Sequence, residues 1–132
     1  MNERKNPQIL LNYERDKIMD DNDKSGKLIE TFVYNQIAAI TDLHRQWEIF
    51  HYRDAKQRKI DLIVKTLECV FGIEVKTGRT VKSEDFKHLK WFKNNMELDK
   101  PFIRVVLYTG GAVSPFSDSA YAVPISALWQ SL

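Results

Sequence analysis

Apolar positions along the chain recur with two different periods, and the change of period marks the elements. From Lys27 to about Ile40 they recur every three or four residues, which predicts a helix with one buried stripe. Residues 47–53, 58–65 and 69–76 are instead short runs rich in β-branched and aromatic residues, which predict strands. Because the connections between these runs are short, we expect an antiparallel three-stranded meander.

The second half of the chain predicts a further helix and two more strands. Ser83 is expected to cap a helix that continues to about Met96. Phe102–Thr109 predicts an interior strand, Ser119–Val123 a shorter strand, and Ile125–Leu132 a final short helix. A helical crossover between two strands implies a parallel pair within a mixed sheet. The expected fold class is therefore α/β, a mixed sheet with helices on both faces.

The N-terminal segment differs in composition from the rest of the chain. Residues 1–23 are mostly polar and are predicted to be an extension or linker, while residues 24–132 form one domain. A short amphipathic helix is expected from about Pro7, since proline is tolerated in a first turn. Asp23 or Ser25 could cap the next helix. The acidic run before it lacks the spaced ligands of a calcium loop.

Composition limits the classes of partner and compartment. The 132 residues carry a formal net charge of only +2, so charge alone would not hold the protein on nucleic acid. The single cysteine, Cys69, is expected to be a small buried thiol within a strand, which fits a reducing cytoplasm. No apolar run approaches membrane-spanning length, so we expect a cytoplasmic protein without a membrane partner.

Charged side chains interrupt two of the predicted strands. Asp61 follows Ile60 in one strand, and Glu74 and Lys76 flank Val75 in the next. Side chains on a strand alternate between faces, so Glu74 and Lys76 project together, and a hairpin would bring Asp61 to Glu74. The pattern predicts two carboxylates and an amine in one small volume, which suits a metal site. The alternative is an ordinary solvated strand end.

Two further sets of charged residues have an equally open interpretation. Glu30 lies beside the apolar stripe of the first helix, where it is either a third acid of the metal cluster or half of a surface ion pair. Lys87, Lys90 and Lys93 recur at every third position of the second helix, with Lys82 just before it. This row either contacts phosphates or is a solvated helix face.

The Ile60-Asp61 and Ile73-Glu74-Val75-Lys76 motifs, in this order of elements, resemble the PD-(D/E)XK nuclease superfamily. The chain is more closely similar to one branch, the C-terminal domain of unknown function attached to many prokaryotic AAA-type ATPases. This similarity is carried by Gly26–Val33, Tyr52-Arg53, Gly72–Lys76 and Ala122–Trp129. The resemblance covers about residues 24–130 and implies a restriction-endonuclease-like sheet with an α-β-β-β-α-β core. This chain departs from it at Lys59, where the branch often has an acid, and lacks the superfamily's proline before the aspartate.

The resemblance also implies an activity, which is Mg²⁺- or Mn²⁺-dependent hydrolysis of DNA phosphodiester bonds. Asp61, Glu74 and the backbone carbonyl of Val75 would hold the metal, Lys76 would position the attacking water, and Glu30 would complete the site. The expected phosphate contacts are Arg79, Lys82, Lys87 and Lys90.

Other functions remain open. The chain has no Gly-x-x-x-x-Gly-Lys-Ser/Thr loop, so it is not itself a P-loop ATPase. It could instead be a non-catalytic regulatory or partner-binding domain of an AAA-type ATPase system that keeps the nuclease fold. A toxin-like or effector-like nuclease controlled by a partner protein is a third interpretation.

Overall fold

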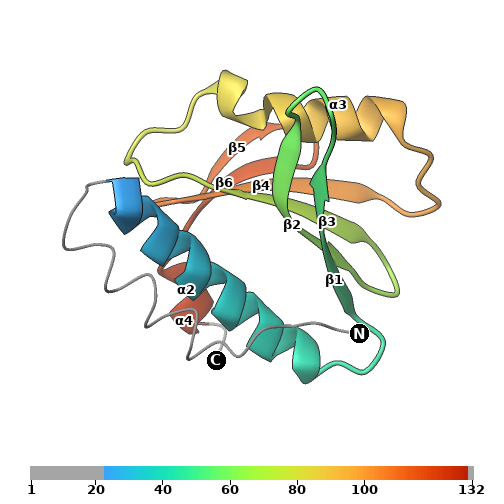
Figure 1. The fold of residues 1–132 in the computed structure, drawn as a ribbon, viewed down its shortest axis with the longest axis horizontal. Helices are drawn as coiled ribbons and strands as arrows, with labels where there is room; N and C mark the ends of the chain where they lie inside the picture. The colour runs from blue at the N-terminus through green and yellow to red at the C-terminus, as the bar shows by residue number, and fades with distance from the viewer. Residues whose placement is uncertain (1–22, 131–132) are drawn as a thin grey trace.

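The computed structural model of the protein describes residues 23–130 and forms one six-stranded mixed sheet between two helical layers (Figure 1). The strand order across the sheet is β1-β2-β3-β4-β6-β5. In chain order the elements are α2 (Asp23–Asp42), β1 (Glu48–Arg53), β2 (Lys59–Lys65), β3 (Val70–Val75), the 3₁₀ turn η1 (Ser83–Phe86), α3 (Lys87–Asn95), β4 (Phe102–Tyr108), β5 (Ser114–Ser117), β6 (Ala120–Pro124) and α4 (Ala127–Gln130).

The pairing of the strands confirms the expected α/β class and its α-β-β-β-α-β core. Strands β1, β2 and β3 form an antiparallel meander. Strand β4 pairs parallel with β3 after the crossover through α3, and β6 pairs parallel with β4. Strand β4 is therefore interior, which agrees with its run of Ile, Val and Leu residues.

Each face of the sheet packs against its own helix. Helix α3 covers one face, where Leu89 and Phe92 meet Phe102 and Val106, and all four side chains are buried. Helices α2 and α4 lie on the other face, where Val33 packs with residues of β2, β3 and β4 (Figure 1). The two layers follow from alternation along the strands, which sends neighbouring residues to opposite faces.

Both helices next to the sheet begin differently from the sequence prediction. Helix α2 starts at Asp23, so Ser25 lies inside its first turns and the prediction that it caps the helix is wrong. Ser83 is likewise the first residue of η1, and Lys82 is the cap. The Lys82 backbone N–H donates to the Asp85 carboxylate at 2.8 Å.

Three smaller predictions also need correction. The short strand β5 at the edge of the sheet was not predicted, because its Ser-Pro-Phe-Ser sequence has no apolar alternation. Cys69 is a free, half-buried cysteine in the turn before β3, not a buried thiol within a strand. The final helix is shorter than predicted within the described residues, since α4 covers only Ala127–Gln130.

Two expectations fall outside the part of the chain that the structure describes. The short helix expected from about Pro7 lies wholly within residues 1–22, and so does nearly all of the predicted extension. Among residues 23–130, no helix combines the length and the apolar character that crossing a membrane requires.

Candidate functional site

A bulge in β2 sets the position of Asp61. Two steps along β1, from Phe50 to Tyr52, match three steps along β2, from Ile63 to Ile60, so β2 carries one extra residue. Ile60 and Ile63 consequently both enter the core under α3 although they are three residues apart. Bulges redirect a side chain that a regular strand would send elsewhere. Here the redirected residue is Asp61, whose Oδ2 accepts the backbone N–H of Val75 at 2.8 Å.

The same geometry brings Asp61 next to Glu74. The pairing of β2 with β3 ends at Leu62 opposite Ile73, and Asp61 and Glu74 are the next residues along the two strands. The Glu74 side chain is only 14% exposed. Burial, followed by the charge and hydrogen bond of Asp61, raises the pKa of Glu74 from 4.5 to about 9. At neutral pH Glu74 therefore keeps its proton.

Lys59 supplies the counter-charge of this pair. Its Nζ lies 2.8 Å from Asp61 Oδ1, and its side chain is 45% exposed, whereas that of Asp61 is 15% exposed. Burial lowers the pKa of Lys59, but the hydrogen bond and charge of Asp61, with the charges of Glu74 and Glu30, raise it overall. Lys59 therefore pairs with Asp61 and also interacts electrostatically with the other two predicted acids, Glu74 and Glu30.

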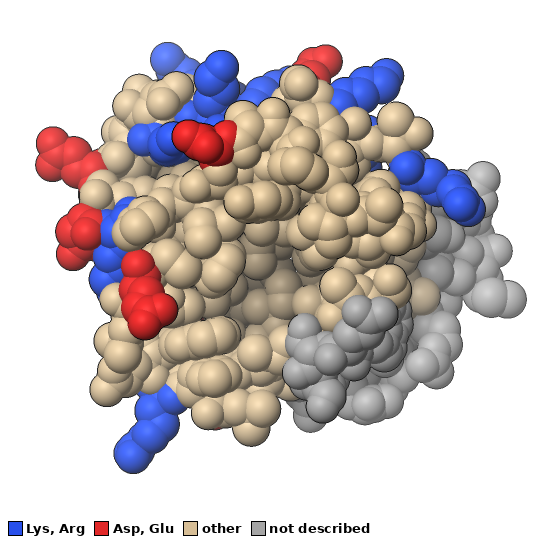
Figure 2. All heavy atoms as spheres, turned by 180° about the vertical axis from the view of Figure 1, so that it is seen from behind, with Lys and Arg blue, Asp and Glu red and all other residues tan. Residues whose placement is uncertain are grey.

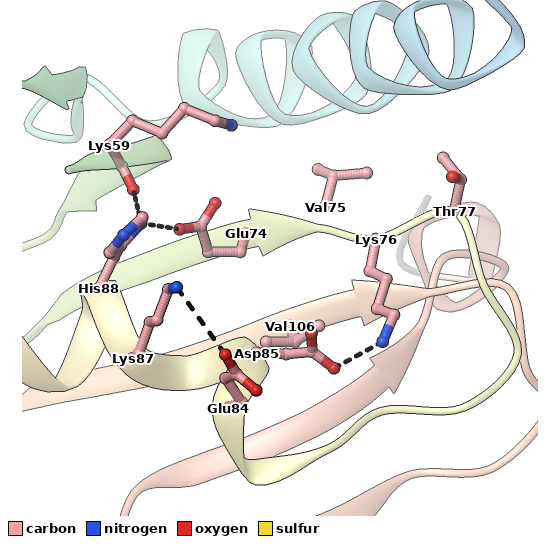
Figure 3. A pocket seen from close by; sticks show the side chains of 10 residues that line it. All are labelled: Lys59, Glu74, Val75, Lys76, Thr77, Glu84, Asp85, Lys87, His88 and Val106. Atoms are coloured by element: carbon pink, nitrogen blue, oxygen red, sulfur yellow. Dashed lines mark hydrogen bonds and ion pairs between the residues drawn. The ribbon is translucent and has the colours of Figure 1, made fainter. Parts of the chain in front are cut away.

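Lys76 lies in the same pocket as Glu74 but pairs with a different acid. Its Nζ donates to Asp85 Oδ2 at 2.7 Å, and the close view shows this side chain directed toward η1, away from Glu74 (Figure 3). Burial raises the pKa of Asp85, but the hydrogen bonds and charges of Lys76 and Lys82 together outweigh burial, so the pKa is lowered overall. The ion pair fastens the end of β3 to η1.

His88 of α3 completes the wall of the pocket opposite Lys76. Its Nδ1 lies 3.2 Å from the Lys59 carbonyl oxygen and 3.9 Å from Glu74 Oε2 (Figure 3). The longer contact is an ion pair only where His88 is protonated and Glu74 ionised. Because Glu74 keeps its proton at neutral pH, the contact does not act as an ion pair there.

The carboxylates open into two adjoining hollows. The larger is an open pocket of about 430 Å³ whose lining includes Glu74, Lys76, His88 and two further lysines, Lys59 and Lys87. The smaller, of about 190 Å³, is lined by Asp61 together with Glu30, Thr31 and Tyr34 of α2. Val75 lines both hollows, so the end of β3 forms the partition between them.

Glu30 lies near Asp61, but it does not form a three-ligand metal site with Asp61 and Glu74. It is exposed on α2 and lines the hollow of Asp61. No group of three or more His, Cys, Asp or Glu residues within the described chain has the geometry to hold a metal ion. The structure thus brings Asp61 and Glu74 together, with Glu30 at the margin of their site.

Of the four predicted phosphate contacts, only Lys87 lines the larger pocket. Its Nζ lies 3.9 Å from Glu84 Oε2. Lys82, Lys90 and Arg79 are exposed, Lys90 on α3 and the other two on the loop before η1. Lys and Arg side chains gather along the edge of the molecule where α3 lies (Figure 2). We call the four exposed residues Arg79, Lys82, Lys87 and Lys90 the cationic rim.

The residues present fit a partly hydrated Mg²⁺ site. Mg²⁺ is commonly held in enzymes by one or two carboxylates, with waters and substrate phosphate oxygens as the remaining ligands. Asp61 and Glu74 provide two carboxyl groups, and burial together with Asp61 keeps Glu74 protonated at neutral pH. The backbone carbonyl of Val75 belongs to the same strand end.

Sequence reasoning missed two residues of this site. Asp85 holds Lys76, and His88 contacts Glu74 and the Lys59 carbonyl oxygen, yet neither residue was among the predicted site residues. Their spacing of three residues places Asp85 and His88 on one side of the helix, next to the stripe that carries Phe86 and Leu89. Since Phe86 and Leu89 are buried against the sheet, Asp85 and His88 lie at the border of that buried stripe.

Comparison with known proteins gives a family without an assigned activity. A family model described as "Domain of unknown function (DUF4143)" matches residues 25–128. None of the curated proteins matches the chain. The matched range runs from the first turns of α2 into α4, so it includes the whole sheet and every residue of the site described above.

Proposed function

The chain belongs to the DUF4143 family of domains of unknown function, and we propose that its Asp61–Glu74 site binds a divalent metal and hydrolyses phosphodiester bonds in DNA. A PD-(D/E)XK-like assignment of the domain is part of this proposal. The observation that carries it is the buried carboxyl pair, in which burial and Asp61 raise the pKa of Glu74 to about 9. Perturbed, paired carboxyl groups at a pocket are typical of functional sites.

Each residue of the site has a defined task in this proposal. When bound, Mg²⁺ or Mn²⁺ would polarise a phosphodiester oxygen and lower the pKa of a bound water. Asp61, Glu74 and the Val75 carbonyl would hold the ion, with Glu30 orienting a water from the adjoining hollow. Lys76, released from Asp85, would orient the attacking water and offset the charge that develops on the phosphate.

The surroundings of the acids favour an anionic substrate. The larger pocket has lysines on both sides of Glu74, and the exposed cationic rim continues from it over α3. A phosphodiester backbone would place one charge at the pocket and the next charges along the rim, which includes Lys82, Lys90 and Arg79. Such contacts give affinity that falls with salt and carry no sequence preference.

A cleavage assay with matched variants tests this function. Purified protein is incubated with supercoiled plasmid and Mg²⁺ or Mn²⁺, and compared with Glu74→Gln, Asp61→Asn and Glu84→Gln. Glu84 is 79% exposed on η1, so its substitution makes the same chemical change outside the carboxyl pair. We expect metal-dependent nicking by the wild type and Glu84→Gln, and none by the other two variants. Equal nicking by all four proteins would attribute it to a contaminant and refute the proposal.

A second function is favoured by the two lysine ion pairs. Lys59 and Lys76 are each bound to a carboxylate, at 2.8 Å and 2.7 Å, which gives the site an internal charge balance without a metal. A domain that keeps this balance would be a non-catalytic module that binds a partner protein, such as an AAA-type ATPase. Isothermal titration separates the two functions, because the module should show no heat of binding with millimolar Mg²⁺ or Mn²⁺.

A further inference from the structure

The position of Lys59 has a consequence for any cation that enters the site. Its ammonium contacts Asp61 Oδ1 at 2.8 Å, and Glu74 and Glu30 lie close enough to interact with it electrostatically. The close view shows the side chain running past Glu74 toward α2 (Figure 3). The ammonium therefore lies beside the Asp61–Glu74 pair, which is where a metal ion would be attracted.

We propose that Lys59 is a built-in competitor of the metal: its ammonium neutralises Asp61 in the metal-free protein and must leave when a divalent cation binds. This inference rests on the proposed metal site and adds to it a residue that sets metal affinity. It assigns Lys59 to controlling occupancy of the site, a task separate from binding the substrate.

The partners of Asp61 determine which group would have to move. One oxygen accepts the backbone N–H of Val75, which is fixed because Val75 pairs with Leu107 in the middle of the sheet. The other oxygen accepts Lys59, whose side chain is 45% exposed and can turn into solvent on its flexible stem. A divalent ion about 2 Å from a carboxylate oxygen would lie within a few ångströms of the ammonium, and the two cations repel each other.

Metal titrations on three proteins test the competition. Mn²⁺ binding is measured by calorimetry for wild type, Lys59→Gln and Lys65→Gln, with metal-free protein at pH 8. Lys65 lies at the other end of β2 and is exposed, so its substitution makes the same change of net charge away from the acids. We expect Lys59→Gln to bind Mn²⁺ about tenfold more tightly or better, and Lys65→Gln to match the wild type. Lys59→Arg, which keeps the cation, should remain weak.

The possible results separate this inference from the proposed function. Equal Mn²⁺ affinity of wild type and Lys59→Gln, or weaker binding by the variant, would overturn the competition and leave the metal site standing. An absence of binding by both proteins would overturn the metal site itself. Tighter binding that also appears in Lys65→Gln would reduce the effect to net charge and refute a specific role of Lys59.

A measurement on the unmodified protein keeps the inference testable if Lys59→Gln does not fold. Lysine side chains are labelled with an amine-reactive acetylating reagent, with and without saturating Mg²⁺, and quantified by mass spectrometry. We expect the labelling rate of Lys59 to rise several-fold with Mg²⁺, because its ion pair is broken, while the rate of Lys65 stays constant. Unchanged labelling of Lys59 at a Mg²⁺ concentration that calorimetry shows to be saturating would refute the competition.

Discussion

Replacing Glu74 by glutamine is expected to stabilise the metal-free protein, and to stabilise it more as the pH rises. Burial and the neighbouring Asp61 raise the pKa of Glu74 from 4.5 to about 9 in the folded protein. Glutamine has nearly the shape of a protonated glutamate and keeps an N–H group that can donate to Asp61. The variant is neutral in both the folded and the unfolded state, whereas the unfolded wild type is stabilised by releasing the Glu74 proton above pH 4.5.

The sign and size of the effect follow from proton linkage. The folded protein binds the Glu74 proton more tightly than the unfolded chain, so the stabilisation from this group is fully present below pH 4.5 and is lost as pH rises to about 9. Each pH unit in that window corresponds to about 1.4 kcal/mol. At pH 7 the wild type has lost about 3 kcal/mol relative to its acid form, which the variant retains.

Urea denaturation at pH 5, 7 and 8.5 in the presence of EDTA measures this difference. The free energy of unfolding of Glu74→Gln should exceed that of the wild type by a margin that grows with pH, and the melting temperature at pH 7 should rise by about 10 °C. Glu84→Gln, a matched change on the exposed part of η1, should follow the wild type. Parallel pH profiles for Glu74→Gln and wild type would refute the assignment of a protonated Glu74.

Three further changes test other parts of the molecule. Gly72→Ala would place a Cβ 2.4 Å from Phe102 Cζ. It should lower the free energy of unfolding by about 1–3 kcal/mol, whereas Gly111→Ala, with nothing within 4 Å, should lower it far less in the same urea titration. Asp85→Asn should cost about 1.5–3 kcal/mol in thermal unfolding, because it removes the charged acceptor of an ion pair and of a backbone N–H. Lys90→Glu should weaken DNA binding and reduce the salt slope measured by fluorescence anisotropy by about one unit or more, and an unchanged slope would exclude it from the interface.

The sequence was sufficient for the layers and pairing of the fold because both depend on local periodicity. The apolar stripe of α2 and the runs of β2 and β4 each carried a pattern strong enough to identify the element. Strand β5 had no such pattern, since it has only four residues with one large apolar side chain, Phe116, and it depends on pairing with β6. The starts of α2 and η1 were misplaced because several residues near each could act as caps.

The site was predictable in part for the same reason. Alternation along β3 predicted the shared direction of Glu74 and Lys76, and the hairpin predicted the proximity of Asp61. The ammonium next to Asp61 belongs to Lys59, two residues earlier on β2, and the bulge beyond Ile60 decides which face of the sheet Asp61 joins relative to Ile63. A bulge depends on the register between strands, which no single strand's sequence specifies. The pairing of Lys76 with Asp85 likewise depends on where η1 packs.

Both proposed functions fit the same geometry, because they differ only in what happens to the charges of the site. In the metal-free protein, Glu74 keeps its proton, Asp61 is neutralised by Lys59, and Asp85 is neutralised by Lys76. A metal site requires this balance to be broken, since Glu74 must ionise and both lysines must leave their partners. A partner-binding module requires the balance to persist. Catalysis therefore depends on whether the attraction of a divalent ion for two carboxylates exceeds the cost of separating these pairs, and Lys59→Gln alters that cost directly.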